Sequence, residues 1–390
     1  MVWETKRIKD FASLITEKTS NENKVALENI EEATGKFIET DSEFDGEGIH
    51  FLKGDVLYGK LRPYLRKVWL SNTEGNAVGD IFVFRNKKNS IPEYLKWLFL
   101  SEDFTSKCNG STQGAKMPRV DSNYILTLSY ELPSLEIQKK IAAFLDSKTQ
   151  NIDKRIELLQ KKKEHYVILR KAIINEVVNG DEKDWKICRM KDVFSFSKGL
   201  SITKADLVET GIPVISYGQI HSKQNKSVEI DDSLIRYVPE SYLATEKNAL
   251  TEQYDFIFAD TSEDFEGCGN NVYVDRNETL FAGYHTIILR NRKHQDNKFL
   301  AYLFLSDSWR IQIRKSVCGI KVFSITQSDL APVKIRIPPK AKQKQIVNYL
   351  DKKTSAIDSI VEKITKEIDT LKIYRRALIN ETVTGKLNIG

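Results

Sequence analysis

Two stretches of the sequence carry apolar residues at alternating three- and four-residue steps, the spacing that places side chains along one stripe of a long helix. The first helix is predicted to span 41 residues, 138–178, which is about 60 Å at 1.5 Å per residue. A stripe this narrow and long is typical of a coiled coil, because a lone helix would leave it in water. The predicted stripe residues are Leu145, Ile152, Ile156, Leu159, Tyr166 and Ile173 in the first helix and Leu350, Ile357, Val361, Ile364, Ile368, Leu371 and Leu378 in the second.

The two stretches are copies of one another. Residues 133–180 return 205 residues later as residues 338–385, without a gap, and 20 of the 48 positions are identical. Each copy begins at a proline and ends at a glycine, as helices commonly do. Each helix follows a globular segment, so we expect the two copies to pair in antiparallel orientation. Arg170 and Arg375 fall on the stripe, where they either fix the register of the pair or extend their charged ends to the surface.

The segments between the helices have the pattern of small mixed domains. Glycine-bounded apolar runs at 55–58 and 81–84 predict strands, and residues 92–107 predict a helix that begins with a proline. The second segment repeats this plan at the same offset from about Asp80 onward, whereas upstream the two differ in length and sequence. The predicted fold class is α+β, with two globular domains of mixed α/β structure, separated by two long helices that pair as an antiparallel coiled coil, and a pseudo-twofold internal repeat. The predicted domains are residues 1–132, 133–180, 181–337 and 338–390.

Composition narrows the classes of protein without selecting one. Hydrophobic residues make up 41% and charged residues 29% of 390 positions, which is ordinary for a globular chain. The sequence has neither a long apolar run nor the start of a signal peptide, so we predict a cytoplasmic protein without membrane contact. The four cysteines lack metal-binding spacing, which predicts no metal site. Net charge is +6, and the two helical copies each carry +4, which is consistent with contact to phosphates or with a solvated lysine-rich face.

Motifs for catalysis are missing from the sequence. Neither a phosphate-binding loop nor a zinc-binding HExxH pattern occurs. Gly267-Cys268-Gly269 superficially resembles the loop that binds S-adenosylmethionine, but the residues after it predict a turn into a strand instead of a helix. We therefore predict a non-catalytic chain that holds no cofactor.

Several loops instead suit DNA, since they place basic, aromatic and amide side chains on glycine-containing turns. Such side chains bind phosphates and base edges, and a glutamine can bind adenine through two hydrogen bonds. Taken singly, each loop is also compatible with a plain exposed turn. The candidate DNA-binding residues of the first segment are Lys60, Arg62, Tyr64, Arg66, Lys67, Ser111, Thr112, Gln113, Lys116 and Arg119, and those of the second are Tyr217, Gln219, His221, Lys223, Gln224, Thr261, Ser262 and Lys321.

The whole chain resembles the specificity subunits of type I restriction–modification enzymes. That family has two variable target-recognition domains that alternate with two similar long helices. Each helix typically begins with a Pro-Pro-Leu-x-Glu-Gln run, followed by an Ile-Ala-x-Phe-Leu-Asp-like stretch. Here the stretches are Ile141–Asp146 and Ile346–Asp351. Both copies lack the glutamate that usually precedes the glutamine, since Ile137 and Lys342 stand there.

The resemblance implies that each domain recognises one half of a split, asymmetric DNA target and that the helices set the unread spacer. It implies as partners double-stranded DNA, two methyltransferase subunits and, in the full complex, restriction subunits. S-adenosylmethionine, ATP and Mg²⁺ would belong to those partners. Two other hypotheses stay open at this stage: an inactive or decoy scaffold that has lost DNA recognition, and a methyltransferase with its own recognition domains.

Overall fold

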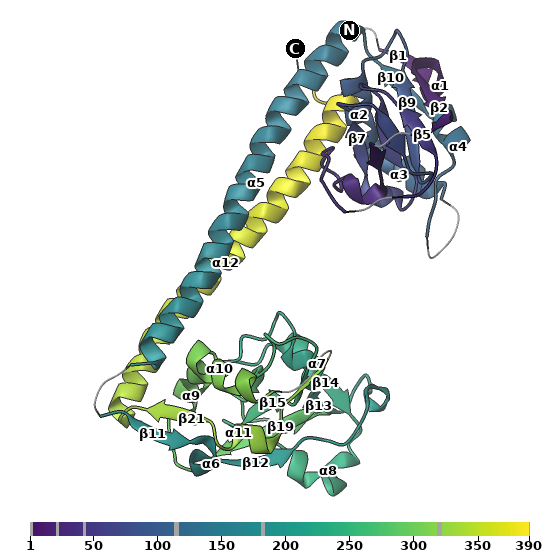
Figure 1. Ribbon diagram of the computed structural model, residues 1–390. Helices are drawn as coiled ribbons and strands as arrows, with labels where there is room; N and C mark the ends of the chain where they lie inside the picture. The colour runs from purple at the N-terminus through teal and green to yellow at the C-terminus, as the bar shows by residue number, and fades with distance from the viewer. Residues whose placement is uncertain are drawn as a thin grey trace. The chain divides into compact units, whose positions relative to one another are not determined.

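The computed structural model describes residues 3–20, 23–41, 44–112, 117–180, 184–317 and 322–389. It divides into two compact units, of which unit 1 comprises residues 1–161 and 364–390 and unit 2 comprises residues 162–363. The boundary falls inside both long helices, α5 (Leu135–Val178) and α12 (Lys340–Val383). Each unit therefore contains one globular head and a part of each helix (Figure 1). Head 1 is the part of the chain before α5, and head 2 is the part between α5 and α12.

Head 1 is built on two four-stranded sheets, with strand orders β2-β9-β6-β7 and β3-β5-β8-β4, and a short β1-β10 pair. Buried aliphatic and aromatic side chains fill the space between the first sheet and the helices α2 and α3. The strands are β1 (Glu4–Arg7), β2 (Ala12–Ile15), β3 (Lys18–Thr19), β4 (Lys24–Val25), β5 (Gly48–Phe51), β6 (Val56–Gly59), β7 (Val68–Leu70), β8 (Gly75–Ala77), β9 (Ile81–Asn86) and β10 (Ser129–Leu132). The helices are α1 (Ile8–Phe11), α2 (Pro92–Leu100), α3 (Glu102–Gly110), α4 (Ser122–Thr127) and the 3-10 turns η1 (Leu27–Asn29) and η2 (Pro63–Leu65).

Head 2 has the same central sheet, with strand order β12-β19-β15-β17, followed by a β14-β13-β18 sheet and the pairs β16-β20 and β11-β21. The strands are β11 (Lys186–Arg189), β12 (Phe194–Lys198), β13 (Ile212–Ile215), β14 (Arg236–Val238), β15 (Phe256–Ala259), β16 (Thr261–Ser262), β17 (Asn271–Tyr273), β18 (Phe281–Ala282), β19 (Thr286–Asn291), β20 (Phe323–Ser324) and β21 (Lys334–Ile337). The helices are α6 (Met190–Val193), α7 (Tyr217–Ile220), α8 (Tyr242–Thr245), α9 (Asn297–Phe304), α10 (Asp307–Ser316), α11 (Gln327–Leu330) and the 3-10 turns η3 (Lys204–Asp206), η4 (Asp232–Leu234) and η5 (Lys247–Ala249).

One predicted helix is interrupted in the structure. The sequence pattern predicted a continuous helix over 92–107, but α2 ends at Leu100 and α3 begins at Glu102. Ser101 lies between them in an extended conformation, and its hydroxyl accepts a hydrogen bond from the backbone N–H of Phe104. A serine that caps a helix in this way starts a new one, because it replaces a backbone acceptor that the first turn lacks.

In each unit, part of α5 lies alongside part of α12 in antiparallel orientation (Figure 1). Within unit 1, Asp153 contacts Arg375, whereas Arg155, further along α5, contacts the earlier Glu367 of α12. The apolar residues of the predicted stripes are all buried or half-buried. Those that are buried are Leu145, Ile152, Leu350, Ile357, Ile364, Ile368 and Leu378, and those that are half-buried are Ile156, Leu159, Tyr166, Ile173, Val361 and Leu371.

Each stripe arginine bonds to an aspartate of the other helix instead of extending to solvent. The guanidinium of Arg375 donates from Nε to Asp153 Oδ1 at 2.8 Å, within unit 1. In unit 2, Arg170 donates from Nε to Asp358 Oδ1 at 2.9 Å. Both partners are identical in the repeat, so each unit contains one copy of the same interhelical ion pair.

The identical polar residues of the repeat attach the helices to the heads. Buried Gln138 donates to the carbonyl of Pro133 and accepts from the backbone of Ile91, and Gln343 does the same with Pro338 and Asp296. Each glutamine thereby joins the first turn of its helix to the head that precedes it.

Near the C-terminal end of each long helix, an asparagine that is identical in the two copies attaches the helix to the other head: α12 to head 1 and α5 to head 2. Asn380 accepts from the backbone N–H of Asp103 at 2.9 Å in unit 1, and Asn175 accepts from that of Asp307 at 2.7 Å in unit 2. Each head is therefore held by the start of one helix and the end of the other.

Candidate nucleic-acid interface

In head 1 the candidate residues gather on the connection between β6 and β7, residues 60–67. This segment lies beside residues 117–120, since Leu61 pairs with Arg119 as an isolated bridge and the N–H of Arg62 donates to the carbonyl of Pro118. Arg62, Tyr64 and Arg119 are exposed on these two segments. The structure therefore brings two guanidinium groups and one phenol to the same edge of head 1.

Lys60 lies at the start of this connection and is held by neighbouring residues. Its ammonium is 3.3 Å from the carboxylate of Asp80 and donates to the carbonyl of Gly79. Arg119 approaches the same carboxylate at 3.9 Å, a looser contact that leaves its side chain 56% exposed. Asp80 thus orients both cations, and of the two Arg119 has the more accessible charge.

The side chains of Arg66 and Lys67, at the end of the connection, are bonded to other parts of head 1. Lys67 donates from Nζ to the carbonyls of Leu27 and Ile30 at 2.7 and 3.0 Å. The side chain of Arg66 is 13% exposed and pairs with Glu102 at 3.4 Å. Burial lowers the pKa of the Arg66 guanidinium, because desolvation disfavours its charged form.

Two more candidates of head 1, Ser111 and Thr112, directly follow α3. The hydroxyls of Ser111 and Thr112 donate to the carbonyls of Cys108 and Asn109, so both satisfy the last turn of the helix. Gln113 and Lys116 lie outside the described residues.

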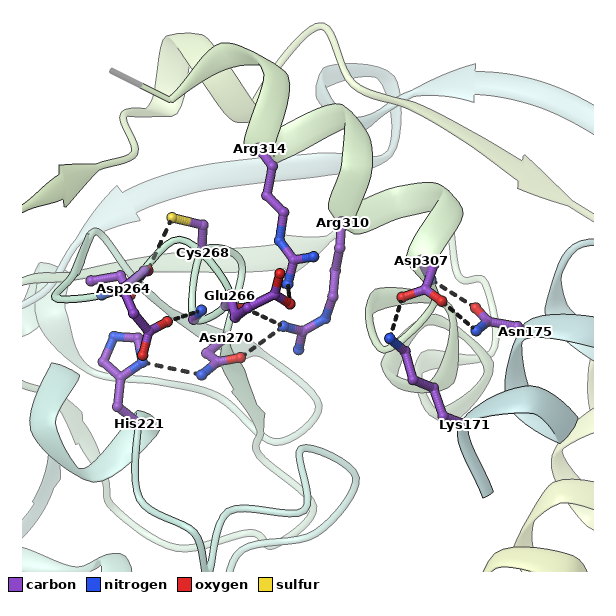
Figure 2. Close-up of polar contacts among 12 residues, drawn as sticks. Lys171, Asn175, His221, Asp264, Glu266, Cys268, Asn270, Asp307, Arg310 and Arg314 are labelled. Carbon is purple, nitrogen blue, oxygen red and sulfur yellow. Dashed lines mark hydrogen bonds and ion pairs between the residues drawn. The ribbon is translucent and has the colours of Figure 1, made fainter. Parts of the chain in front are cut away.

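In head 2, Tyr217 and His221, which lie at the two ends of α7, come together with Thr261 of β16. The ring of His221 is 6.2 Å from that of Tyr217, and its Nε2 donates to the carbonyl of Thr261 at 2.8 Å. Its Nδ1 accepts from the amide of Asn270 at 3.1 Å, so both ring nitrogens are used inside the head (Figure 2). His221 therefore positions the loop between β15 and β17, and its ring nitrogens are not available to a ligand.

The remaining candidates of head 2 are divided between exposed and internal positions. Lys223 and Gln224 are exposed, whereas the Gln219 side chain accepts from the backbone of Ser216 and so completes the first turn of α7. Ser262 is buried and donates to the carbonyl of Asp264. Lys321 lies outside the described residues.

Sequence reasoning missed Tyr284 and His285, which the fold places beside Tyr217, and Asp260, which contacts His285. The rings of Tyr284 and His285 lie 5.6 and 5.4 Å from that of Tyr217, and His285 Nδ1 is 3.3 Å from Asp260 Oδ1. His285 also has a positive φ of 54°, an unusual conformation for a residue with a side chain. A Tyr-His dipeptide before a strand gives no signal of this contact, because Tyr217 is 67 residues away along the chain.

The loop between β15 and β17 is clamped by two arginines of α10 (Figure 2). Arg310 donates to the side-chain oxygen of Asn270 at 2.8 Å, and Arg314 donates to the backbone carbonyl of Glu266 at 2.6 Å and pairs with its carboxylate at 2.8 Å. Burial lowers the pKa of Arg310 to about 10, because the desolvated guanidinium loses hydration. The clamp fixes the shape of the loop and uses the charges of both arginines.

The same helix is tied to α5 at its first turn (Figure 2). Asp307 pairs with Lys171 at 2.7 Å and accepts from the side-chain amide of Asn175 at 2.8 Å, and the carbonyl oxygen of that amide accepts from the Asp307 backbone. A chain of contacts within unit 2 thus runs from α5 through α10 to the loop.

Neither a metal site nor a membrane-spanning helix is found among the residues that the structure describes. They contain no group of three or more His, Cys, Asp or Glu side chains placed to hold a metal ion. Among the helices that the structure describes, none is long and apolar enough to cross a membrane.

The sequence matches the family model described as the type I restriction modification DNA specificity domain over residues 2–165 and again over 182–370. The chain belongs to this family. Its function, as the resemblance of the sequence predicted, is DNA sequence specificity in a type I restriction–modification system. The double match also agrees with the internal repeat, since each match contains one head and one stretch of long helix.

Two relatives in the family are each 24% identical to this chain over the parts that align. The specificity subunit of the type I restriction enzyme MjaVIII from Methanocaldococcus jannaschii is 24% identical, over 99% of this chain and 93% of the relative. The EcoKI specificity subunit from Escherichia coli is 24% identical over 52% of this chain and 43% of the relative.

Solved structures show the same fold. The HsdS subunit from Thermoanaerobacter tengcongensis superimposes with a TM-score of 0.56 at 18% identity, over 99% of this chain and 97% of that chain. A chain from a structure of complex assembly and conformational transition of the type I restriction–modification system gives a TM-score of 0.78 at 18% identity, over 99% and 98% of the two chains. These likenesses confirm the predicted α+β fold class with two heads and two long helices.

Proposed function

We propose that each head binds one half of a split, asymmetric DNA target and that the chain itself carries no catalytic residue. The observation that supports this most strongly is the contrast between the two heads. They share a central sheet and the same polar anchors to the helices, yet they present different side chains at the loops that hold the DNA-binding candidates. One framework with two surfaces suits a target whose halves differ in sequence.

The helix pair is proposed to set the length of DNA between the halves. Its stripe is regular, so removing one heptad from both helices keeps the apolar register while shortening the pair. One turn of B-DNA is about 34–36 Å, and seven residues of helix are about 10 Å at 1.5 Å per residue. We therefore expect such a deletion, made in both helices, to change the preferred spacer. An unchanged spacer would show that the helices do not measure it.

The proposed partners are double-stranded DNA, two methyltransferase subunits that dock on the helix pair, and restriction subunits in the full complex. S-adenosylmethionine, ATP and Mg²⁺ would be held by those partners. The assignment draws on the family membership and on the basic character of both helices, since residues 133–180 and 338–385 each carry a net charge of +4. Swapping head 1 alone is expected to alter one half of the motif only.

The deciding experiment is a methylome. The chain is co-expressed with its neighbouring methyltransferase subunit, N6-methyladenine is mapped, and the methyltransferase subunit alone serves as control. A split motif with a fixed gap that depends on this chain supports the proposal. Assembly of the complex without chain-dependent methylation would reject it in favour of an inactive scaffold.

A further inference from the structure

The central sheets of the two heads can be aligned strand by strand from their hydrogen-bond registers. In head 1, Val56 pairs with Phe84 and Gly59 with Ile81. In head 2, Phe256 pairs with Leu289 and Ala259 with Thr286. The β6–β9 pair therefore corresponds to β15–β19, with offsets of 200 residues for the first strand and 205 for the second. By this register Lys60 corresponds to Asp260, and Asp80 to His285.

At one end of these strands the two heads keep the same ion pair. Asp55 is buried and contacts Arg85 at 2.7 Å. Its counterpart Asp255 is equally buried and contacts Arg290 at 2.9 Å. A buried carboxylate requires its partner, and this pair is therefore part of the shared framework.

At the other end the carboxylate lies on the opposite strand end. Lys60 pairs with Asp80 in head 1, whereas the same two positions in head 2 hold Asp260 and His285, 3.3 Å apart. The backbone hydrogen bond at this point is retained, from Lys60 to Asp80 at 3.0 Å and from Asp260 to His285 at 3.1 Å. Backbone geometry is thus preserved while the side-chain chemistry is reversed.

The reversal extends through the loop that follows. The connection Lys60–Lys67 contains four basic residues and no acidic one, and we call it the basic loop. The corresponding connection Asp260–Asn270 contains four acidic residues and no basic one, and we call it the acidic loop. Two loops at one place in the same fold therefore present opposite charges.

Each loop exposes an aromatic side chain and a charged side chain that forms no ion pair among the described residues. In the basic loop Arg62 is exposed and Tyr64 is 51% exposed, and in the acidic loop Glu263 is exposed and Phe265 is 45% exposed. Within the part of the chain that the structure describes, neither Arg62 nor Glu263 forms an ion pair. The other acidic residues of the acidic loop each have a partner in head 2: Asp260 contacts His285, Asp264 accepts from the N–H of Gly267, and Glu266 pairs with Arg314. Asp264 and Glu266 are nevertheless exposed, so Glu263 differs from them in having no ion pair or cap to hold it.

Both loops are held in fixed shapes. Arg62 and Arg66 adopt positive φ angles of 48° and 49° on either side of η2, and such conformations persist only where the surroundings enforce them. The acidic loop turns at Gly269, with φ of 89° against the ring of Trp309, and is clamped by α10. A rigid loop suits recognition, because little conformational entropy is lost on binding.

We propose that Arg62 and Glu263 are specificity-determining residues of their respective heads, an inference that rests on the proposed function. An exposed guanidinium complements the acceptor edge of guanine, O6 and N7. A carboxylate repels phosphate and complements the exposed amino groups of the major groove, on cytosine N4 or adenine N6. The charge reversal between equivalent loops thereby makes the two half-sites chemically different.

The test uses the complete chain in complex with its methyltransferase subunit and compares Arg62→Ala, Glu263→Ala and a control, Glu240→Ala, which removes an exposed carboxylate of head 2 outside the loop. Each variant is assayed by methylome mapping. Glu263→Ala is expected to relax one base position in one half-site, with discrimination reduced about 5- to 150-fold. Arg62→Ala is expected to relax a position in the other half-site. Glu240→Ala is expected to leave the motif unchanged.

Other outcomes overturn the proposal in distinguishable ways. If the wild-type chain directs no split motif, the proposed function itself fails. If wild type gives the motif and both loop variants keep it intact, the loops do not determine specificity. If Glu263→Ala weakens complex assembly at an unchanged motif, the acidic loop binds a protein partner. If Glu263→Ala strengthens DNA binding equally for all sequences, its carboxylate merely repels phosphates.

Discussion

Asp153→Ala removes the carboxylate that faces Arg375 in unit 1. The side chain of Arg375 is 9% exposed and that of Asp153 is 17% exposed. The variant leaves the guanidinium with the carbonyls of Ala33 and Thr34, which it contacts at 2.7 and 3.0 Å, and without a countercharge. Loss of one partner from a buried ion pair costs about 3–5 kcal/mol, and the two retained acceptors favour the lower end of that range.

The repeat provides a matched control in unit 2. Asp358→Ala removes the equivalent carboxylate from Arg170, but these side chains are 32% and 19% exposed. A partly solvated pair contributes about 1 kcal/mol or less. Asp153→Ala is therefore expected to destabilise its unit about three times as much as Asp358→Ala.

Hydrogen exchange followed by mass spectrometry can measure the two effects separately. Peptides from the α12 segment of unit 1 are expected to exchange about 150-fold faster in Asp153→Ala, and those from the α5 segment of unit 2 about 5-fold faster in Asp358→Ala, since about 1.4 kcal/mol is a factor of ten. Asp153→Leu combined with Arg375→Met should recover most of the loss, because replacing both charges removes the buried unpaired group. Equal effects of the two single variants, or a larger effect of Asp358→Ala, would refute the argument from burial.

Two further predictions concern the cores of the heads. Gly269→Ala is expected to destabilise unit 2 by about 2–4 kcal/mol, because a methyl group would lie 2.7 Å from the Trp309 ring at a positive φ. Gly218→Ala serves as control, because a methyl group at Gly218 would meet open space. Equal urea midpoints for Gly269→Ala and Gly218→Ala would contradict the predicted clash with Trp309. Burial raises the pKa of the Cys108 thiol from 9.0 to about 12, so the unfolded chain loses this proton first and stability falls as pH rises from 9 toward 12. At pH 10 the thiol lowers the free energy of unfolding by about 1.4 kcal/mol. The free energy of unfolding of Cys108→Ala should therefore change less between pH 8 and pH 10 than that of the wild-type chain. The same pH dependence in both proteins would exclude the thiol as its source.

The sequence predicted the long helices well because their information is local and repeated. A stripe at helical spacing and a second copy of it identify both elements without knowledge of the heads. The break at Ser101 was missed because both halves of the predicted helix have apolar patterns in phase, and only the hydroxyl contact to Phe104 separates them. A hydrophobic pattern does not indicate where a side-chain hydroxyl caps a new helix.

The binding loops were predicted less completely, for a different reason. Lys67 looks like its basic neighbours in sequence, but the carbonyls of Leu27 and Ile30 that hold it are some 40 residues distant in the chain. The equivalence of the basic and acidic loops was hidden because the connection from β15 to β19 in head 2 is longer than that from β6 to β9 in head 1. The offset between equivalent residues is therefore 200 at β6 and β15 but 205 at β9 and β19. Strand register reveals the match, whereas the linear alignment does not.

The way each head is held by two helices also bears on the order of folding. Unit 2 is one continuous stretch, residues 162–363, whereas unit 1 joins residues 1–161 to residues 364–390. The contact of Arg375 with Ala33 spans 342 positions. During synthesis from the N-terminus, head 1 emerges first and yet must wait for the last helix, while head 2 can complete its core earlier. The head made first is therefore the one finished last, and until then its side of α5 offers an exposed apolar stripe to chaperones or to other copies of the chain.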